Sequence, residues 1–234
     1  MKLPPLVEGR LLGRRQRFFA DVDLGGETVV AHCPNTGSML GCKEPGSRVW
    51  ISRADNEKRK LAWTWEVVET APGVAVGIHT GRSNRLVEEA LVGGCLPELA
   101  GYAYLRREVK YGREGSRIDL LAEWSDGRLA YLEVKNVTAA AQDRVALFPD
   151  AVSERGSKHL RELMAMVAEG HRAAVIFCAQ RGDVDEVRPA DTIDPEYGRT
   201  LRRALAAGVE AYALGATVSP TEILLKRRLP VVCP

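Results

Sequence analysis

The stretch SRIDLLAEWSDGRLAYLEVKNV, residues 116–137, predicts two β-strands joined by a tight turn. The strands are predicted over 118–124 and 129–137, and Gly127 suits the left-handed last position of a three-residue hairpin loop. Apolar side chains fall on both sides of the two strands, which is typical of a sheet covered on two faces. These apolar residues are Leu120, Leu121, Leu132 and Val134.

The turn also determines which residues of the hairpin face each other. A three-residue loop pairs Trp124 with Arg128, so by the same count Asp119 lies opposite Glu133. Directly opposite residues have Cβ atoms about 4.5–5.5 Å apart. Side chains alternate along a strand, so Glu133 and Lys135 share a face. The hairpin therefore predicts two acids and a lysine on one small patch of sheet.

Such a patch has the chemistry of a metal-dependent phosphodiesterase. Adjacent carboxylates are costly to hold ionised unless a cation lies between them, and Mg²⁺ or Mn²⁺ takes oxygen ligands of this kind. A lysine one step along the strand would orient the attacking water or take a proton from it. Asp119, followed after thirteen residues by Glu133-x-Lys135, resembles the signature of PD-(D/E)xK nucleases.

A plainer interpretation stays open beside that hypothesis. Glu-x-Lys is a common tripeptide, and a second copy, Glu108-Val109-Lys110, follows no acid-bearing hairpin. Glu133 and Lys135 would then form a solvated charge pair on a half-exposed sheet. The apolar character of both strands favours a functional site, because charged residues are seldom buried in a doubly covered sheet without a partner.

The composition is that of an ordinary globular protein of one or two domains. The 234 residues are 45% hydrophobic and 27% charged with a net charge of +2, so any nucleic-acid affinity must come from local patches. The first residues lack the apolar segment of a signal peptide, and no apolar run reaches the length of a membrane span. Five cysteines without a CxxC pair indicate reduced thiols, so we expect a cytoplasmic protein without a membrane partner.

Residues 1–72 are predicted to form a small all-β barrel, with the OB-fold as the first candidate. Turn residues separate five short strands, expected at 6–15, 17–24, 27–33, 48–53 and 60–69. Pro72-Gly73 marks the expected boundary, and residues 73–234 then show mixed helix and strand patterns. In that second domain we predict a short connecting strand at 74–78, helices at 84–92 and 197–207 and after Asp150, and strands at 106–111, 172–179 and, as the last strand, 209–214.

Basic residues interleave with aromatic residues in the barrel, a combination that binds single strands through backbone attraction and base stacking. The alternative is that Trp63 and Trp65 belong to the barrel core and the arginines to a solvated edge. A second basic strip lies at helical spacing after Asp150, where a solvated face is the usual meaning. The residues assigned to nucleic-acid binding are Arg14, Arg15, Arg17, Asn35, Arg53, Lys58, Arg59, Lys60, Arg155 and Lys158.

The chain closely resembles the sugar fermentation stimulation protein A (SfsA) family of prokaryotes along nearly its whole length. The matching segments include HCPNTGSM (32–39), RVW (48–50), SNRL (83–86), EVKYG (108–112), SRID (116–119), EVK (133–135), FPDAV (148–152) and KHL (158–160). The resemblance implies an N-terminal OB-fold, a C-terminal PD-(D/E)xK nuclease-like (restriction-endonuclease-like) domain, DNA binding, and a role in expressing sugar (maltose) utilisation genes. It also implies Glu89 as the third acid of the site, while Ile118 stands where the nuclease consensus has proline.

Two hypotheses of different classes follow. The first is a Mg²⁺- or Mn²⁺-dependent nuclease acting on DNA, with RNA as the alternative substrate. Its metal ligands would be Asp119, Glu133, Glu89 and the carbonyl of Val134. Lys135 would orient the attacking water. The second is a non-cleaving, largely sequence-nonspecific DNA-binding regulator whose nuclease site is a relic. The complete set of two acids and a lysine favours the first; the oligomeric state stays open, with a homodimer among the alternatives.

Overall fold

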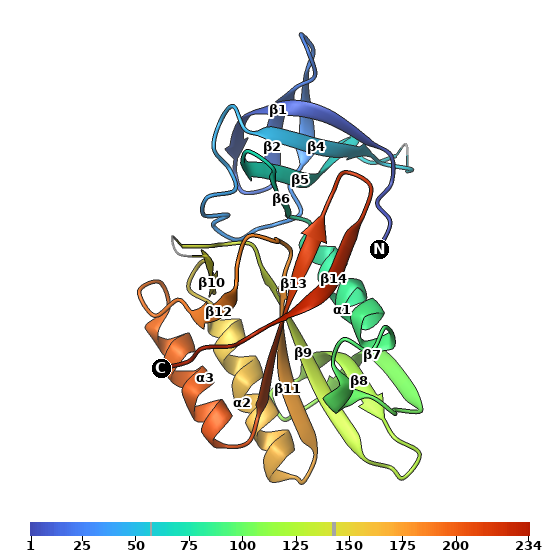
Figure 1. Ribbon diagram of the computed structural model, residues 1–234, viewed down its shortest axis with the longest axis vertical. Helices are drawn as coiled ribbons and strands as arrows, with labels where there is room; N and C mark the ends of the chain where they lie inside the picture. Colours follow the sequence, from blue (N-terminus) through green and yellow to red (C-terminus); the bar gives the residue numbers. More distant parts are fainter. Residues whose placement is uncertain (57, 142–143) are drawn as a thin grey trace.

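The computed structural model describes residues 1–56, 58–141 and 144–234, and Figure 1 shows a β-barrel stacked on an α/β domain. Each strand of the barrel pairs with its neighbours in the order β3-β2-β1-β4-β5, and a parallel pairing of β3 with β5 closes the ring. This closed, five-stranded arrangement confirms the predicted OB-fold. Its strands are β1 (Leu6–Arg15), β2 (Phe19–Asp23), β3 (Thr28–His32), β4 (Arg48–Arg53) and β5 (Trp63–Ala71).

The barrel interior takes up much of the aromatic surface that a nucleic acid would need for stacking. Trp65 is fully buried in the barrel core, and Trp63 is half-buried against it. Trp50 lies outside that core and is 7% exposed, with the Arg48 guanidinium 4.8 Å from the centre of its ring. The core interpretation is therefore correct for Trp65. Phe18, in the β1–β2 turn, is 48% exposed and is the aromatic residue of this region that remains open to solvent.

The boundary between the domains lies later than predicted. Pro72 and Gly73 form the turn between β5 and a sixth strand, β6 (Val74–Gly77), which pairs with β5 in the barrel sheet. The predicted division at 72 and 73 therefore falls inside the N-terminal sheet, because that Pro-Gly turn closes a hairpin. At the other end, Met1 is buried in the core of the C-terminal domain, so the first residues belong to that domain.

The C-terminal domain has a six-stranded mixed sheet in the order β14-β13-β11-β9-β8-β7, covered on both faces. One core lies between the sheet and α1 (Ser83–Val92). A second lies between the sheet and the pair α2 (Glu154–Ala168) and α3 (Pro195–Ala206) (Figure 1). The prediction of a doubly covered sheet is thus confirmed. The strands are β7 (Tyr104–Tyr111), β8 (Ser116–Glu123), β9 (Leu129–Val137), β11 (Arg172–Ala179), β13 (Glu210–Val218) and β14 (Ile223–Leu229).

The three helices lie close to their predicted positions. They are α1 (Ser83–Val92), α2 (Glu154–Ala168) and α3 (Pro195–Ala206), and two 3₁₀ turns, η1 (Thr80–Arg82) and η2 (Pro97–Leu99), flank α1. Ser153 caps α2 by accepting from the backbone N–H of Gly156 at 3.0 Å. The cap fixes where α2 begins, and α2 carries the residues that face the hairpin. No helix of the described residues has both the length and the apolar character to cross a membrane.

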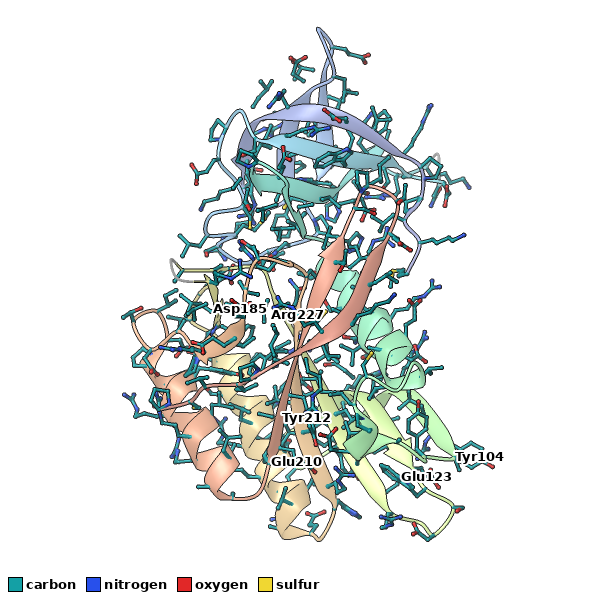
Figure 2. The ribbon with its side chains drawn as sticks, in the orientation of Figure 1. Tyr104, Glu123, Asp185, Glu210, Tyr212 and Arg227 are labelled. Carbon is teal, nitrogen blue, oxygen red and sulfur yellow. The ribbon has the colours of Figure 1, made fainter. Side chains whose placement is uncertain are left out.

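Three strands were not predicted. β14 follows the strand expected to be last, and the four-residue strands β10 (Val145–Phe148) and β12 (Glu186–Pro189) form a small parallel pair. β14 is an edge strand whose alternation is obscured by the run Lys226-Arg227-Arg228. Figure 2 shows Arg227 beside Asp185, to which its Nη1 donates at 2.8 Å, so part of this charge is neutralised within the chain.

Candidate functional site

The hairpin of β8 and β9 has the predicted register. The ladder runs from Glu123 opposite Leu129 to Leu120 opposite Leu132, with Gly127 at φ 83° in the turn. Pairing stops one step before Asp119 and Glu133. There the Oδ2 atom of Asp119 accepts from the backbone N–H of Val134 at 2.7 Å, so a side chain takes the place of the next ladder bond.

Glu133 lies in the interior beside the catalytic lysine candidate. It is 3% exposed and Lys135 is 9% exposed, so these groups are not a solvated pair. The Oε1 atom of Glu133 accepts from Lys135 Nζ at 2.8 Å and is also in hydrogen-bond contact with His159. Its Oε2 atom is buried and has no hydrogen-bond partner among the described residues. A buried carboxylate oxygen without a partner is costly, and a cation or a water placed there would satisfy it.

The two carboxyl groups of the hairpin have pKa values that move apart. Burial and then the charge of Glu133 raise the pKa of Asp119 to about 6, against bonds from Val134 and Asn84 that lower it. Burial would raise the pKa of Glu133 as well, but His159 and Lys135 outweigh it and hold that pKa below its usual value. Repulsion between the two acids is the condition that a bound cation relieves.

His159 joins the site although the sequence did not single it out. It lies on α2, is 5% exposed, and its Nε2 accepts from Arg155 Nε at 3.3 Å. The proton of a neutral imidazole then lies on Nδ1, which donates to Glu133. The Nδ1 atom is also 3.5 Å from Lys135 Nζ. The four-residue spacing of Arg155 and His159 on one helix face was the available signal.

The helix acid expected at Glu89 does not join these groups. Its carboxylate pairs with the Met1 ammonium at 2.9 Å and with Arg85 at 3.1 Å. The α1 residue that contacts Asp119 is Asn84, whose Nδ2 donates to Oδ1 at 2.8 Å. Five residues along a helix correspond to about 140° of rotation, so Glu89 points away from the face that carries Asn84. Glu88, on the Asn84 face, pairs with Arg107.

Further metal ligands would have to come from side chains beyond the hairpin. In the part of the chain that the structure describes, no three His, Cys, Asp or Glu side chains converge as a ligand group. Glu108, from the second Glu-x-Lys tripeptide, is linked to the hairpin through Asn84: its Oε1 lies 3.5 Å from the same Nδ2 that binds Asp119. Its backbone has φ 53°, an uncommon value for a residue other than glycine.

The barrel residues assigned to nucleic-acid binding fall into three groups. Arg14 is used inside the fold, because its guanidinium donates to the carbonyls of residues 17, 35, 37 and 38. Arg15 pairs with Asp21 at 2.9 Å, and the Oδ1 of the buried Asn35 accepts from the N–H of Gly37. The exposed barrel residues are Arg17, Arg53, Lys58, Arg59 and Lys60.

Arg155 and Lys158 are the assigned residues that lie next to the hairpin. Arg155 is exposed and contacts His159, and Lys158 Nζ donates to the carbonyl of Glu114 at 2.6 Å, in the loop that leads into β8. The structure therefore brings together Asp119, Glu133 and Lys135, and Arg155 is linked to them through His159, whereas Lys158 contacts the loop before β8. It does not bring Glu89 to them.

Comparisons with known proteins agree with this architecture. A family model described as "SfsA N-terminal OB domain" matches residues 12–78, and one described as "Sugar fermentation stimulation protein RE domain" matches residues 81–222. These matches divide the chain just after β6.

The relatives cover nearly the full chain. A sugar fermentation stimulation protein homolog of Thioalkalivibrio sulfidiphilus is 62% identical over 97% of this chain and 96% of its own length. A homolog of Alkalilimnicola ehrlichii is 59% identical over 98% of both chains. The solved structure of Pyrococcus furiosus SfsA in complex with Ca²⁺ is 29% identical, with a TM-score of 0.89 over 99% of this chain and 98% of that one. The chain therefore belongs to the SfsA family, with an N-terminal OB domain followed by a restriction-endonuclease-like domain.

Proposed function

We propose that this chain is a divalent-metal-dependent nuclease that hydrolyses phosphodiester bonds of DNA at the Asp119, Glu133 and Lys135 centre. The observation that carries the proposal is the buried Oε2 of Glu133, without a partner among the described residues, beside a second carboxyl whose pKa is raised to about 6. A bound divalent cation explains two buried acids in this state better than a purely structural role does.

The donor set fits a hard cation. Carboxylate oxygens of Asp119 and Glu133 and the carbonyl of Val134 would hold Mg²⁺ or Mn²⁺, ions that accept one or two carboxylates and complete their shell with water or substrate phosphate. The relative from Pyrococcus furiosus has been solved in complex with Ca²⁺, which supports a divalent ion in this family. When bound, the ion would polarise the phosphodiester and lower the pKa of a water.

Lys135 and His159 have separate roles beside the proposed metal ligands. Lys135 Nζ, which donates to Glu133, would orient the attacking water and stabilise negative charge that develops on the phosphate. His159 fixes Oε1 of Glu133 through Nδ1, which leaves Oε2 as the oxygen available to a ligand. Burial of these groups strengthens their electrostatic interactions with the reacting phosphate.

The nucleic acid would lie along α2 and the loop before β8. Arg155, Lys158 and Arg161 lie at three-residue spacing on α2 and supply positive charge beside the site, whereas the whole chain carries only +2. Contacts of this kind go to phosphates and carry little sequence information. We therefore propose binding that is electrostatic and weakly selective for sequence, with the exposed basic residues of the barrel extending it.

The test is incubation of the pure protein with labelled single- and double-stranded DNA and RNA, with Mg²⁺, Mn²⁺ or a chelator. The proposal predicts cleavage of DNA that requires the metal and is abolished by Lys135→Met. A metal-dependent activity that survives in Lys135→Met would come from another site or a contaminant and would refute the assignment.

One observation favours the alternative of a non-cleaving DNA-binding regulator. Lys135 and His159 already bind Glu133, and no third acidic side chain joins the pair among the described residues. If the protein binds DNA but cleaves none of the four substrates with either metal, the regulator of sugar-utilisation genes is the better account.

A further inference from the structure

A second pocket lies at the junction of the two domains, beyond the end of the catalytic hairpin. It has a volume of about 290 Å³, at the lower limit of small-ligand sites, which measure about 300–1,000 Å³. Its walls come from the loop after β3, from η1, from the end of β9 and the residue that follows it, and from β10 and the segment after it. The lining residues are Asn35, Thr36, Gly37, Thr80, Asn136, Thr138, Leu147, Phe148 and Asp150.

The wall contributed by the barrel is a loop with a fixed conformation. Asn35, which is 4% exposed, turns its Oδ1 back to the N–H of Gly37 at 2.9 Å. Arg14 Nη2 donates to the carbonyls of Asn35 at 2.7 Å and Gly37 at 3.0 Å. These bonds hold the loop in place before any ligand arrives, so little conformational entropy is lost on binding.

The same loop is fastened to the C-terminal domain. The backbone N–H of Met39 donates to Oδ2 of Asp150 at 2.9 Å, and the hydroxyl of Thr80 donates to the carbonyl of Pro34 at 2.8 Å. Gly37 packs so closely on Asp150 that an added Cβ would lie 2.6 Å from its Oδ1. The two sides of the pocket are therefore held at a constant separation.

The polar groups in the pocket include both donors and acceptors. Asn136 uses its Oδ1 twice, accepting from Ser83 Oγ at 2.9 Å and from Gln180 Nε2 at 2.6 Å, so its amide N–H₂ is oriented as a donor. Asp150 Oδ1 takes no hydrogen bond among the described residues and is an acceptor. An acidic side chain in the wall disfavours a phosphate as occupant.

The remaining lining combines hydroxyl groups with an apolar surface. Thr36 and Thr138 can donate or accept. The ring of Phe148 is half-buried and is held by Phe177 and Tyr197, with ring centroids at 5.6 and 5.1 Å. Apolar walls with a few oriented donors and acceptors are the usual composition of a site for a flat heterocycle.

We propose that this pocket receives one unpaired nucleobase of a single-stranded nucleic acid and reads its hydrogen-bonding edge. The inference rests on the proposed nuclease function, because it places the base on the strand being cut. β9 rises about 3.3 Å per residue, so Thr138 lies about 10 Å beyond Lys135, the length of about three stacked nucleotides. Asn136 and Thr138 would contact the base while the scissile phosphate would lie near Lys135, which carries the positive charge of the hairpin.

The test measures binding of free deoxynucleosides to the full chain by NMR chemical-shift changes, in chelator, so that neither metal nor cleavage is involved. We expect millimolar binding of at least one nucleoside, with shifts at residues 35–37 and 136–138, and no binding of deoxyribose 5-phosphate, which lacks a base. The double variant Thr36→Val/Thr138→Val keeps side-chain shape and should weaken binding about tenfold. Thr28→Val, on the exposed face of β3, is the matched control and should bind like the parent.

The single variant Thr36→Val changes an exposed residue and replaces the double variant in the binding measurement if the double variant unfolds. The proposal is overturned if no nucleoside binds at millimolar concentration, if deoxyribose 5-phosphate binds equally well, or if the threonine variants bind like the parent. Nucleoside binding without any nuclease activity would retain the pocket and refute only the proposed function. Cleavage without nucleoside binding would refute the pocket proposal and retain the proposed function.

Discussion

His159 on α2 donates from Nδ1 to Oε1 of Glu133 on β9, and this one buried contact joins the helix layer to the candidate metal site. Its consequence is an asymmetric carboxylate. One oxygen is held by His159 and Lys135, and the other is buried without a partner among the described residues. Ligating carboxylates are commonly held by such outer hydrogen bonds, which orient the free oxygen toward the metal.

Replacing His159 by alanine should therefore weaken metal binding without removing a ligand. We expect Mn²⁺ affinity to fall about 10- to 100-fold, and the free energy of unfolding to drop by about 1–3 kcal/mol because Glu133 loses a buried hydrogen bond. Isothermal titration calorimetry and urea unfolding measure the two effects. His171→Ala, outside the site, is the control. Parent-like Mn²⁺ affinity in His159→Ala would show that the contact is only structural.

The raised pKa of Asp119 predicts a specific pH dependence. The folded pKa is about 6 against an ordinary value of 3.8, so between these values the folded state binds more protons than the unfolded state. Stability contributed by this group is therefore complete below about pH 4 and is lost as the pH rises through 6, by up to about 3 kcal/mol. Metal-free Asp119→Asn should lack this loss, so its stability relative to the parent should increase from pH 4 to pH 7 in urea unfolding. A constant difference across that range would contradict the assigned pKa.

The position of Glu89 predicts that it is not a ligand. Glu89→Gln breaks a half-exposed pair with the Met1 ammonium, so stability should fall by at most about 1 kcal/mol. Mn²⁺ affinity should stay at the parent value, whereas Glu133→Gln should lose most of it. Calorimetry on both variants measures the Mn²⁺ affinity. A large loss of affinity in Glu89→Gln would show that Glu89 is a metal ligand.

The arginines of the β1–β2 hairpin should behave differently from one another. Arg17→Ala removes an exposed charge and should lower the slope of log affinity against log salt by about 0.7–0.9. Arg14→Ala should instead lower the melting temperature, since its guanidinium holds the carbonyls of the loop at residues 35–37. Fluorescence anisotropy with labelled DNA over a salt series gives the slope, and Arg199→Ala on α3 is the control. An unchanged slope for Arg17→Ala would remove the hairpin from the interface.

Rules that depend on neighbouring residues were sufficient to predict the β8–β9 hairpin. They were not sufficient to predict which acid of α1 faces it. Turn chemistry and strand alternation depend on neighbouring residues, so the register of the hairpin followed from a three-residue loop that ends at Gly127. Glu89 depended on how α1 is rotated against the sheet, which is set by packing of its apolar face. Arg14 and His159 were misjudged or missed for the same reason: their partners are distant in sequence, and a basic or imidazole side chain looks identical whether it binds solvent, a carbonyl or a carboxylate.

The most direct test of the account is a Mn²⁺ titration by calorimetry on the parent and on Asp119→Asn, Glu133→Gln and Lys135→Met. The account predicts one binding event in the parent, a large loss of affinity in both acid variants, and nearly unchanged binding in Lys135→Met, which keeps the apolar stem of the side chain and removes its charge. Absence of Mn²⁺ binding by the parent, with and without DNA, would contradict the metal-dependent nuclease and leave the DNA-binding regulator.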